Sequence, residues 1–120
     1  MNVESTVEIV LFRVGDTSYG ADASQVVRVA RPTERTQTCA GLGPLERGGR
    51  ALVFRDPEGE EELELRIDEV KRILPVPVAQ LRRVPPATGA PKGVIGFYLE
   101  QDRPVVLVDL PQSLDLPGGQ

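Results

Sequence analysis

Apolar and polar residues alternate near the start of the chain, and this pattern predicts β-strands. Residues 7–14 (VEIVLFRV) carry apolar side chains in both phases of the alternation, as expected for a strand covered on both faces. After a Gly-Asp turn, residues 17–21 (TSYGA) form the predicted return strand of a hairpin. Residues 22–27 (DASQVV) suit a short helical turn, for which Asp22 or Ser24 is available as the cap.

The next stretch loses this regularity. Residues 28–31 (RVAR) are predicted to be extended and are stopped by a proline. Residues 33–50 (TERTQTCAGLGPLERGGR) have neither a helical nor a strand period and are rich in glycine, threonine and charge, so they are predicted to be a loop. A loop of this length is unusual in a compact domain, which indicates a functional or a flexible segment.

A second block of strands begins at residues 51–54 (ALVF). The chain turns through 55–60 and returns over 61–67 (EELELRI), where apolar and charged residues alternate as in a half-exposed strand. Residues 68–73 (DEVKRI) follow. The proline-punctuated segment 74–91 (LPVPVAQLRRVPPATGAP) is predicted to be an extended connector.

The last strands are predicted to form a hairpin over residues 93–110 (GVIGFYLEQDRPVVLVDL). We expect six alternating apolar residues to form the wall of a barrel: Ile95, Phe97, Leu99, Val106, Val108 and Leu110. Residues 111–116 (PQSLDL) are predicted to form one helical turn, and the glycine-rich end 117–120 to fray.

Two stretches repeat one plan, which predicts an internal duplication. Residues 10–29 and 52–73 each read apolar-apolar-Phe-Arg, turn, strand, polar pair, then Val-x-Arg-apolar. The matched residues are Phe12 with Phe54, Val26 with Val70, Arg28 with Arg72, and Val29 with Ile73. Such a duplicated unit is expected for a pair of small β-barrels.

Composition limits the size and the partners of the protein. With 120 residues, 40% of them hydrophobic and 27% charged, the chain is expected to fold as one globular domain. The net charge of −4 argues against nucleic acid as a partner, because phosphate binding needs a basic surface. The apolar runs are too short for a signal peptide or a membrane span, so we expect a cytoplasmic protein without direct membrane insertion.

The sequence offers little for catalysis. It has no histidine, the commonest general base, and its single cysteine, Cys39, has no partner for a disulfide and no histidine to activate it. Asp102 and Asp109 lie ~20 Å apart in an extended hairpin, which is too far for a pair of glycosidase carboxylates. We expect Asp102 to form the turn and Asp109 to cap backbone amides.

Acidic and glycine-rich segments do not indicate a ligand site either. The glutamates of 58–64 do not match the calcium-loop pattern, and strand alternation divides them between two faces. The glycines of 41–49 are not followed by the Gly-Lys-Ser/Thr of a phosphate loop. We therefore expect a binding protein that is not an enzyme and holds no cofactor and no metal.

Three segments resemble, in order, the motifs of CheW-like domains, the coupling adaptors of bacterial chemosensory arrays. Residues 12–32 (FRVGDTSYGADASQVVRVARP) resemble the family's opening strand, turn, Tyr-Gly, helical turn and V-x-E-I-type strand. Residues 63–73 (LELRIDEVKRI) are similar to G-x-x-V-D-E-V-x-x-V, and 93–110 to the closing segment G-x-x-x-x-x-G-x-x-V-x-L-L-D-L. The resemblance covers 5–32 and 51–116.

The resemblance implies an all-β fold, mainly β with one or two short helical turns, in which two SH3-like barrels lie side by side. The family's first half usually ends with G-V-x-N-L-R-G-x-x-x-P-V-x-D-L, and this segment is missing here, so we expect an incomplete first barrel. We divide the single CheW-like domain of residues 1–120 into a first half-unit 5–32, a loop 33–50 replacing the missing strands, a second half-unit 51–116 and a tail 117–120.

The resemblance also implies a function. Family members contact the cytoplasmic tip of chemoreceptors through a groove between the barrels, and a CheA-type histidine kinase through strand ends. Val27, Arg28 and Val29 match the region near the receptor groove, although Arg28 stands where the family often has an acidic residue. We therefore expect a non-catalytic adaptor that keeps receptor binding and has a weakened kinase contact.

An incomplete barrel leaves a sheet edge open, and an open edge templates pairing with another chain. We expect either self-association by strand pairing or a partner that completes the barrel, unless the loop 33–50 covers the gap. A second hypothesis is a small β-barrel subunit or inhibitor of an unrelated protein complex.

Overall fold

A computed structural model of the protein describes residues 5–56, 58–59, 61–83 and 93–113. The strands are β1 (Thr6–Val14), β2 (Thr17–Asp22), β3 (Val26–Ala30), β4 (Arg50–Arg55), β5 (Glu62–Ile67), β6 (Glu69–Pro77), β7 (Arg82–Arg83), β8 (Val94–Glu100) and β9 (Arg103–Val108). The helical turns are η1 (Ala23–Gln25), η2 (Ala40–Leu42), η3 (Val78–Gln80) and α1 (Leu110–Ser113).

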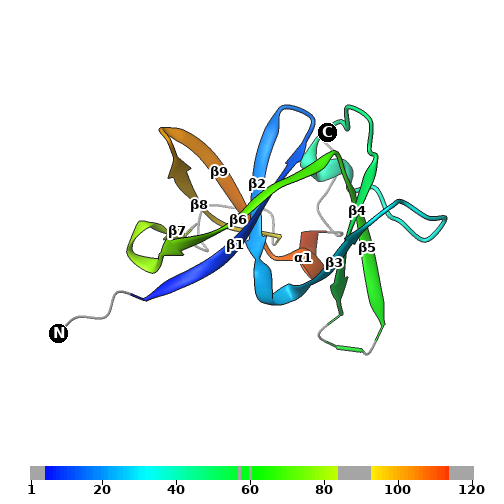
Figure 1. Ribbon diagram of the computed structural model, residues 1–120, viewed down its shortest axis with the longest axis horizontal. Helices are drawn as coiled ribbons and strands as arrows, with labels where there is room; N and C mark the ends of the chain where they lie inside the picture. The colour runs from blue at the N-terminus through cyan, green and yellow to red at the C-terminus, as the bar shows by residue number, and fades with distance from the viewer. Residues whose placement is uncertain (1–4, 57, 60, 84–92, 114–120) are drawn as a thin grey trace.

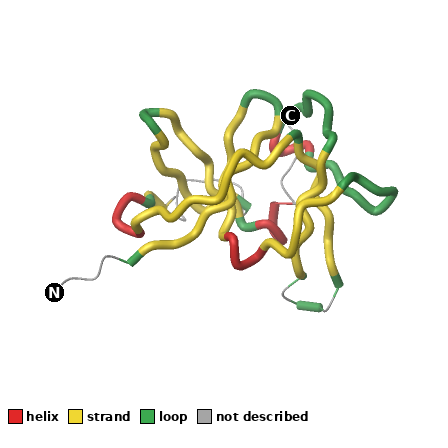
Figure 2. The backbone as a smooth tube through the Cα atoms, viewed as in Figure 1, coloured by secondary structure: helices red, strands yellow, loops and turns green. Residues whose placement is uncertain are grey.

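These strands form two sheets, so the prediction of an all-β fold is confirmed. One sheet has the order β6-β1-β2-β9-β8-β7, and the other has the order β3-β4-β5. Figure 1 shows the small sheet at one end of the molecule and the β7-β8-β9 part of the large sheet at the other. Figure 2 shows that strands make up much of the chain and that short helical turns lie at the connections between them.

The strand predicted to be covered on both faces is β1, and each of its faces belongs to a different core. Val10, Phe12 and Val14 pack in a first core, which contains buried residues from both sheets. Ile9 and Leu11 pack on the opposite side in a second core, within the large sheet. Because both phases of β1 are buried, this strand joins the two ends of the molecule.

The sequence repeat is also a repeat of strand pairing. The equivalent pairs are Phe12 with Val70 and Phe54 with Val26, then Leu11 with Arg72 and Val53 with Arg28. Both ladders contain a bulge at the same step, which passes over Lys71 in β6 and Val27 in β3. Each repeat therefore gives its last strand to the first strand of the other repeat.

The two repeats differ in what lies beside their second strands. β2 pairs in parallel with β9 through Tyr19–Val106 and Gly20–Leu107. At the corresponding edge of β5 there is a parallel bridge from Gln37 to Leu65. The chain then enters η2, where Leu42 is buried in the first core. The segment 33–50 is thus a loop with a fixed path into the core.

The closing hairpin is present, but the predicted inward face of β8 is wrong. Ile95, Phe97 and Leu99 are 49%, 42% and 59% exposed, whereas Tyr98 is 2% exposed and packs in the second core. Tyr98 lies opposite Val105, which faces that core, so the pairing register turns the alternate residues outward. On the C-terminal side, Val108 and Leu110 are buried in the first core, as predicted, and Val106 is partly buried against it.

Two predicted boundaries also change. The connector predicted over 74–91 begins as strand, because β6 continues to Pro77 before η3 and β7. β6 is an edge strand, so a proline whose nitrogen lies on the unpaired side of the strand removes no ladder hydrogen bond. The predicted helical turn over 22–27 is shorter, since η1 covers three residues. Residues 84–91 of the connector, 114–116 of the predicted last turn and the tail 117–120 lie outside the described residues.

Candidate protein-binding site

The predicted receptor-side residues lie together on β3, an edge strand of the small sheet. Val27 is 38% exposed and Val29 is 43% exposed, which is unusual for apolar residues near a core. Val27 is also the bulge residue of the β3–β4 ladder. We call Val27, Arg28 and Val29 the β3 strip.

Arg28 connects the β3 strip to the opposite edge of the same sheet. Its Nη1 atom lies 2.9 Å from Oε1 of Glu62 on β5; the side chains of Arg28 and Glu62 are 53% and 39% exposed. The pairing register places Arg28 on the same face as Val53, which is 1% exposed, so long polar side chains cover the outer face of β4. An exposed ion pair of this kind contributes little to stability, and Arg28 remains available to a partner's carboxylate.

The start of β3 is fixed by polar contacts. The Asp22 carboxylate accepts a hydrogen bond from the Ser24 amide at 2.9 Å, so Asp22 is the cap of η1. The Gln25 side chain donates to Oδ1 of Asp109 at 2.9 Å. Asp109 also accepts from the amide of Gln112 at 3.3 Å, which confirms its predicted capping role. The entry into β3 is therefore tied to the end of β9.

The other aspartate of the closing hairpin also has its predicted role. Asp102 lies in the turn between β8 and β9 with a φ of 65°, and Gln101 before it has a φ of 51°. Aspartate tolerates this left-handed conformation better than most residues. Asp102 is therefore a turn residue.

An apolar cleft of about 800 Å³ lies at one end of the large sheet. It is lined by Val7, Ile9, Gly20, Ala21, Asp22, Val78, Leu81, Arg82, Arg83, Val94, Ile95, Leu107 and Val108. The β3 strip is not part of this lining, but Asp22 belongs to the cleft and caps the turn that begins β3. Sequence reasoning did not find the cleft, because its residues come from five strands and η3.

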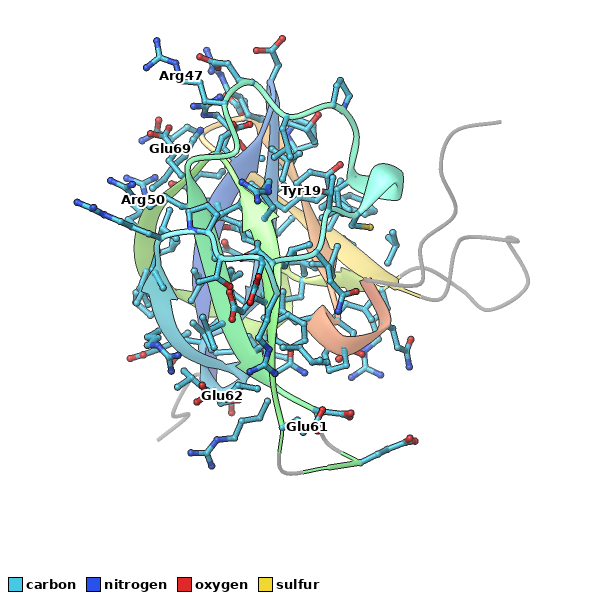
Figure 3. All side chains as sticks on the ribbon, turned by 90° about the vertical axis from the view of Figure 1, so that its right-hand side faces the viewer. Tyr19, Arg47, Arg50, Glu61, Glu62 and Glu69 are labelled. Atoms are coloured by element: carbon cyan, nitrogen blue, oxygen red, sulfur yellow. The ribbon has the colours of Figure 1, made fainter. Side chains whose placement is uncertain are left out.

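A second polar centre, also missed from the sequence, holds the end of the loop 33–50. The Asp68 carboxylate accepts hydrogen bonds from the amides of Gly15, Glu46, Arg47 and Gly48. Burial raises the pKa of Asp68, but the four backbone hydrogen bonds outweigh it and hold the pKa well below its usual value. Figure 3 shows Arg47 and Glu69 at this end of the small sheet, opposite Glu61 and Glu62.

Arg13 adds side-chain contacts to the same centre. Its guanidinium lies 2.7 Å from the Glu46 carboxylate and 3.0 Å from that of Glu69. It also donates to the carbonyl oxygen of Gly15. The turn after β1, the loop before β4 and the junction of β5 with β6 are thereby joined.

Neither a metal site nor a spanning helix is found in the part of the chain that the structure describes. None of its acidic or cysteine side chains form a group of three suited to a metal ion. None of the helices within these residues is long and apolar enough to cross a bilayer. Cys39 is buried.

Comparison with known proteins decides the family. No family model matches the chain. The frizzy aggregation protein FrzB of Myxococcus xanthus is 42% identical over 112 residues, which cover 93% of this chain and 98% of that protein. The scaffolding protein CheW of Thermoanaerobacter tengcongensis has the same fold, with a TM-score of 0.74 at 17% identity, over 96% of this chain and 97% of the solved one.

The chain belongs to the CheW-like family. It is a homologue of FrzB, and its fold is that of the CheW scaffold. The predicted family and fold are confirmed. The role of the β3 strip and the division of this CheW-like chain into half-units stay predictions.

Proposed function

We propose that this CheW-like protein docks the cytoplasmic tip of a chemoreceptor on the β3 strip and the adjoining cleft. The observation that carries the proposal is the exposure of Val27 and Val29 on an anchored edge strand. Apolar residues held in one conformation lose little entropy when a partner covers them. The two arginines of the cleft, Arg82 and Arg83, and the exposed Arg28 suit a helical partner that carries carboxylates beside its apolar residues.

We further propose that the contact with a CheA-type histidine kinase is weakened. In the large sheet a complete hairpin, β8–β9, lies beside β2. Beside β5 the structure places the bridge of Gln37, so the small sheet has fewer strand ends to offer a kinase domain. Such an adaptor modulates a cytoplasmic receptor array more than it builds the array's core unit.

Surface plasmon resonance tests both parts. The protein is immobilised and exposed in turn to a receptor tip and to a kinase regulatory domain from the same organism. We expect the tip to bind at least tenfold more tightly than the kinase domain, a difference of about 1.4 kcal/mol. Equally tight binding of the two partners contradicts the proposal of a weakened kinase contact.

The β3 strip has a matched control within the chain. Val29→Asp introduces a charge on β3, and Ile73→Asp introduces the same charge at the equivalent position of β6, where the isoleucine is 59% exposed. We expect V29D to weaken receptor binding at least tenfold and I73D to leave it unchanged. Equal effects of the two variants contradict a docking site on β3.

A further inference from the structure

The outer edge of β5 is occupied by a short stretch of the chain itself. β5 is an edge strand of the small sheet. The Gln37 amide donates to the Glu64 carbonyl oxygen at 2.9 Å, and the Arg66 amide donates to the Gln37 carbonyl oxygen at 2.8 Å. At the equivalent edge of β2, a regular strand, β9, pairs through Val106 and Leu107. The occupant of the β5 edge is thus much smaller than the site.

This stretch is fastened through one carboxylate. The Thr36 hydroxyl donates to Oε1 of Glu64 at 2.8 Å, and the Thr33 hydroxyl donates to the same atom at 3.0 Å. The Thr33 amide in turn donates to the Thr36 hydroxyl oxygen at 2.8 Å. We call residues 33–37 the edge guard.

The other edge of the same sheet is chemically complementary to β5. β3 and β5 both run antiparallel to β4, so they are parallel to each other. A second copy placed by translation therefore sets its β3 parallel to β5, which is the direction of the Gln37 bridge. If the second copy's Val29 takes the position of Gln37, it faces Leu65, and its Arg28 faces Glu64. In the single chain, it is the Thr36 hydroxyl that donates a hydrogen bond to the Glu64 carboxylate.

We propose that the edge guard blocks a self-association site, and that the β5 edge accepts β3 of a second copy when the guard is released. Apolar Val29 would lie beside apolar Leu65, and basic Arg28 beside acidic Glu64, so the match is in both backbone and side-chain chemistry. The contact is head-to-tail and leaves a free β3 and a free β5 at the ends of each assembly. Growth of the assembly is therefore open-ended, and the edge guard prevents it.

The proposal does not depend on receptor binding, although both contacts use β3. Removing both hydroxyls of the guard, in Thr33→Val together with Thr36→Val, tests it with little change in shape. Thr38→Val is the matched control, because Thr38 is an exposed threonine of the same loop outside the guard. We expect the double variant to form assemblies that grow with protein concentration in sedimentation velocity, while the wild type and T38V stay monomeric. Adding Arg28→Glu to the double variant should return it to the monomer.

A second measurement detects release of the edge guard from β5 even if the double variant does not form large assemblies. We expect hydrogen exchange at the Arg66 amide to accelerate roughly tenfold in the double variant, since that amide loses its Gln37 partner. The labelled peptide VVRVAR, which copies residues 26–31, should then bind the double variant and not the wild type, and the peptide VVEVAE should bind neither. A folded double variant with fast Arg66 exchange that stays monomeric and binds no peptide overturns the proposal. So does assembly that survives Arg28→Glu.

Discussion

The carboxylate of Asp68 accepts a hydrogen bond from the backbone amide of Gly48 at 2.7 Å, although the two residues are 20 positions apart in the chain. The same carboxylate also accepts hydrogen bonds from the backbone amides of Arg47 at 2.7 Å, Glu46 at 2.9 Å and Gly15 at 2.6 Å. A loop without regular structure leaves its amides unpaired unless a side chain or water accepts them. Asp68 therefore replaces the backbone partners that a strand would have supplied to this loop.

Replacing this carboxylate by an amide should loosen the loop. Asp68→Asn removes the charge and turns one acceptor atom into a donor that faces N–H groups. We expect a loss of about 1–3 kcal/mol in the free energy of unfolding, measured by urea denaturation. Asp102→Asn, in the exposed β8–β9 turn, is the control and should change stability by less than about 0.5 kcal/mol. Equal losses in D68N and D102N contradict the role assigned to Asp68.

The Asp68 site should also make the free energy of unfolding depend on pH. The pKa of Asp68 lies well below its usual value because four backbone hydrogen bonds outweigh the effect of burial. A carboxyl whose pKa is lowered by folding stabilises the fold fully above its unfolded pKa of about 3.9, and this stabilisation is lost as the pH falls toward the folded pKa. The wild type should therefore lose its advantage over D68N between about pH 5 and pH 2. Urea titrations at several pH values test this, and a constant difference in stability contradicts it.

The glycine at the first turn should be as sensitive as the aspartate it binds. Gly15 has a φ of 58°, and a Cβ atom there would lie 2.5 Å from the Pro44 carbonyl oxygen. Gly15→Ala combines backbone strain with a clash, so we expect a loss of about 1–3 kcal/mol in unfolding free energy. Gly49→Ala, where a Cβ atom would meet nothing within 4 Å, is the control. Similar stability of the two variants in thermal unfolding contradicts this account.

Patterns local in sequence predicted most of the fold. Alternation in both phases of 7–14 identified β1, and the repeat of Phe-Arg and Val-x-Arg identified segments that do share one register and one bulge. Family motifs supplied the arrangement, which alternation alone does not specify. The family resemblance, and not the repeat, pointed to Val27, Arg28 and Val29, which lie on β3; their role in receptor binding stays a prediction.

Features that depend on contacts between distant segments could not be predicted. In the sequence, nothing distinguishes Asp68 from other residues between two strands. Its role comes from the hydrogen bonds that it accepts from amides 20 to 53 residues away. In β8 both phases are apolar, and only the pairing of Tyr98 with Val105 decides which phase is buried. The cleft and the edge guard also need three-dimensional neighbours, although the threonines of 33–38 were a visible signal of side-chain hydrogen bonding.

The two tyrosines differ in how their hydroxyl groups are satisfied, and this difference is measurable. Both rings are buried, but the Tyr19 hydroxyl donates to the Leu42 carbonyl oxygen at 2.6 Å, whereas the Tyr98 hydroxyl has no hydrogen-bond partner among the described residues. Tyr19→Phe should therefore cost about 1 kcal/mol in unfolding free energy and loosen η2, because it leaves a buried carbonyl unpaired. Tyr98→Phe removes a hydroxyl that is buried without a partner, so it should be neutral or stabilise the protein by up to about 1–2 kcal/mol. Each is the other's control in thermal unfolding, since both delete one hydroxyl from a buried ring. A loss in Y98F as large as that in Y19F would mean that Tyr98 has a partner outside the described residues.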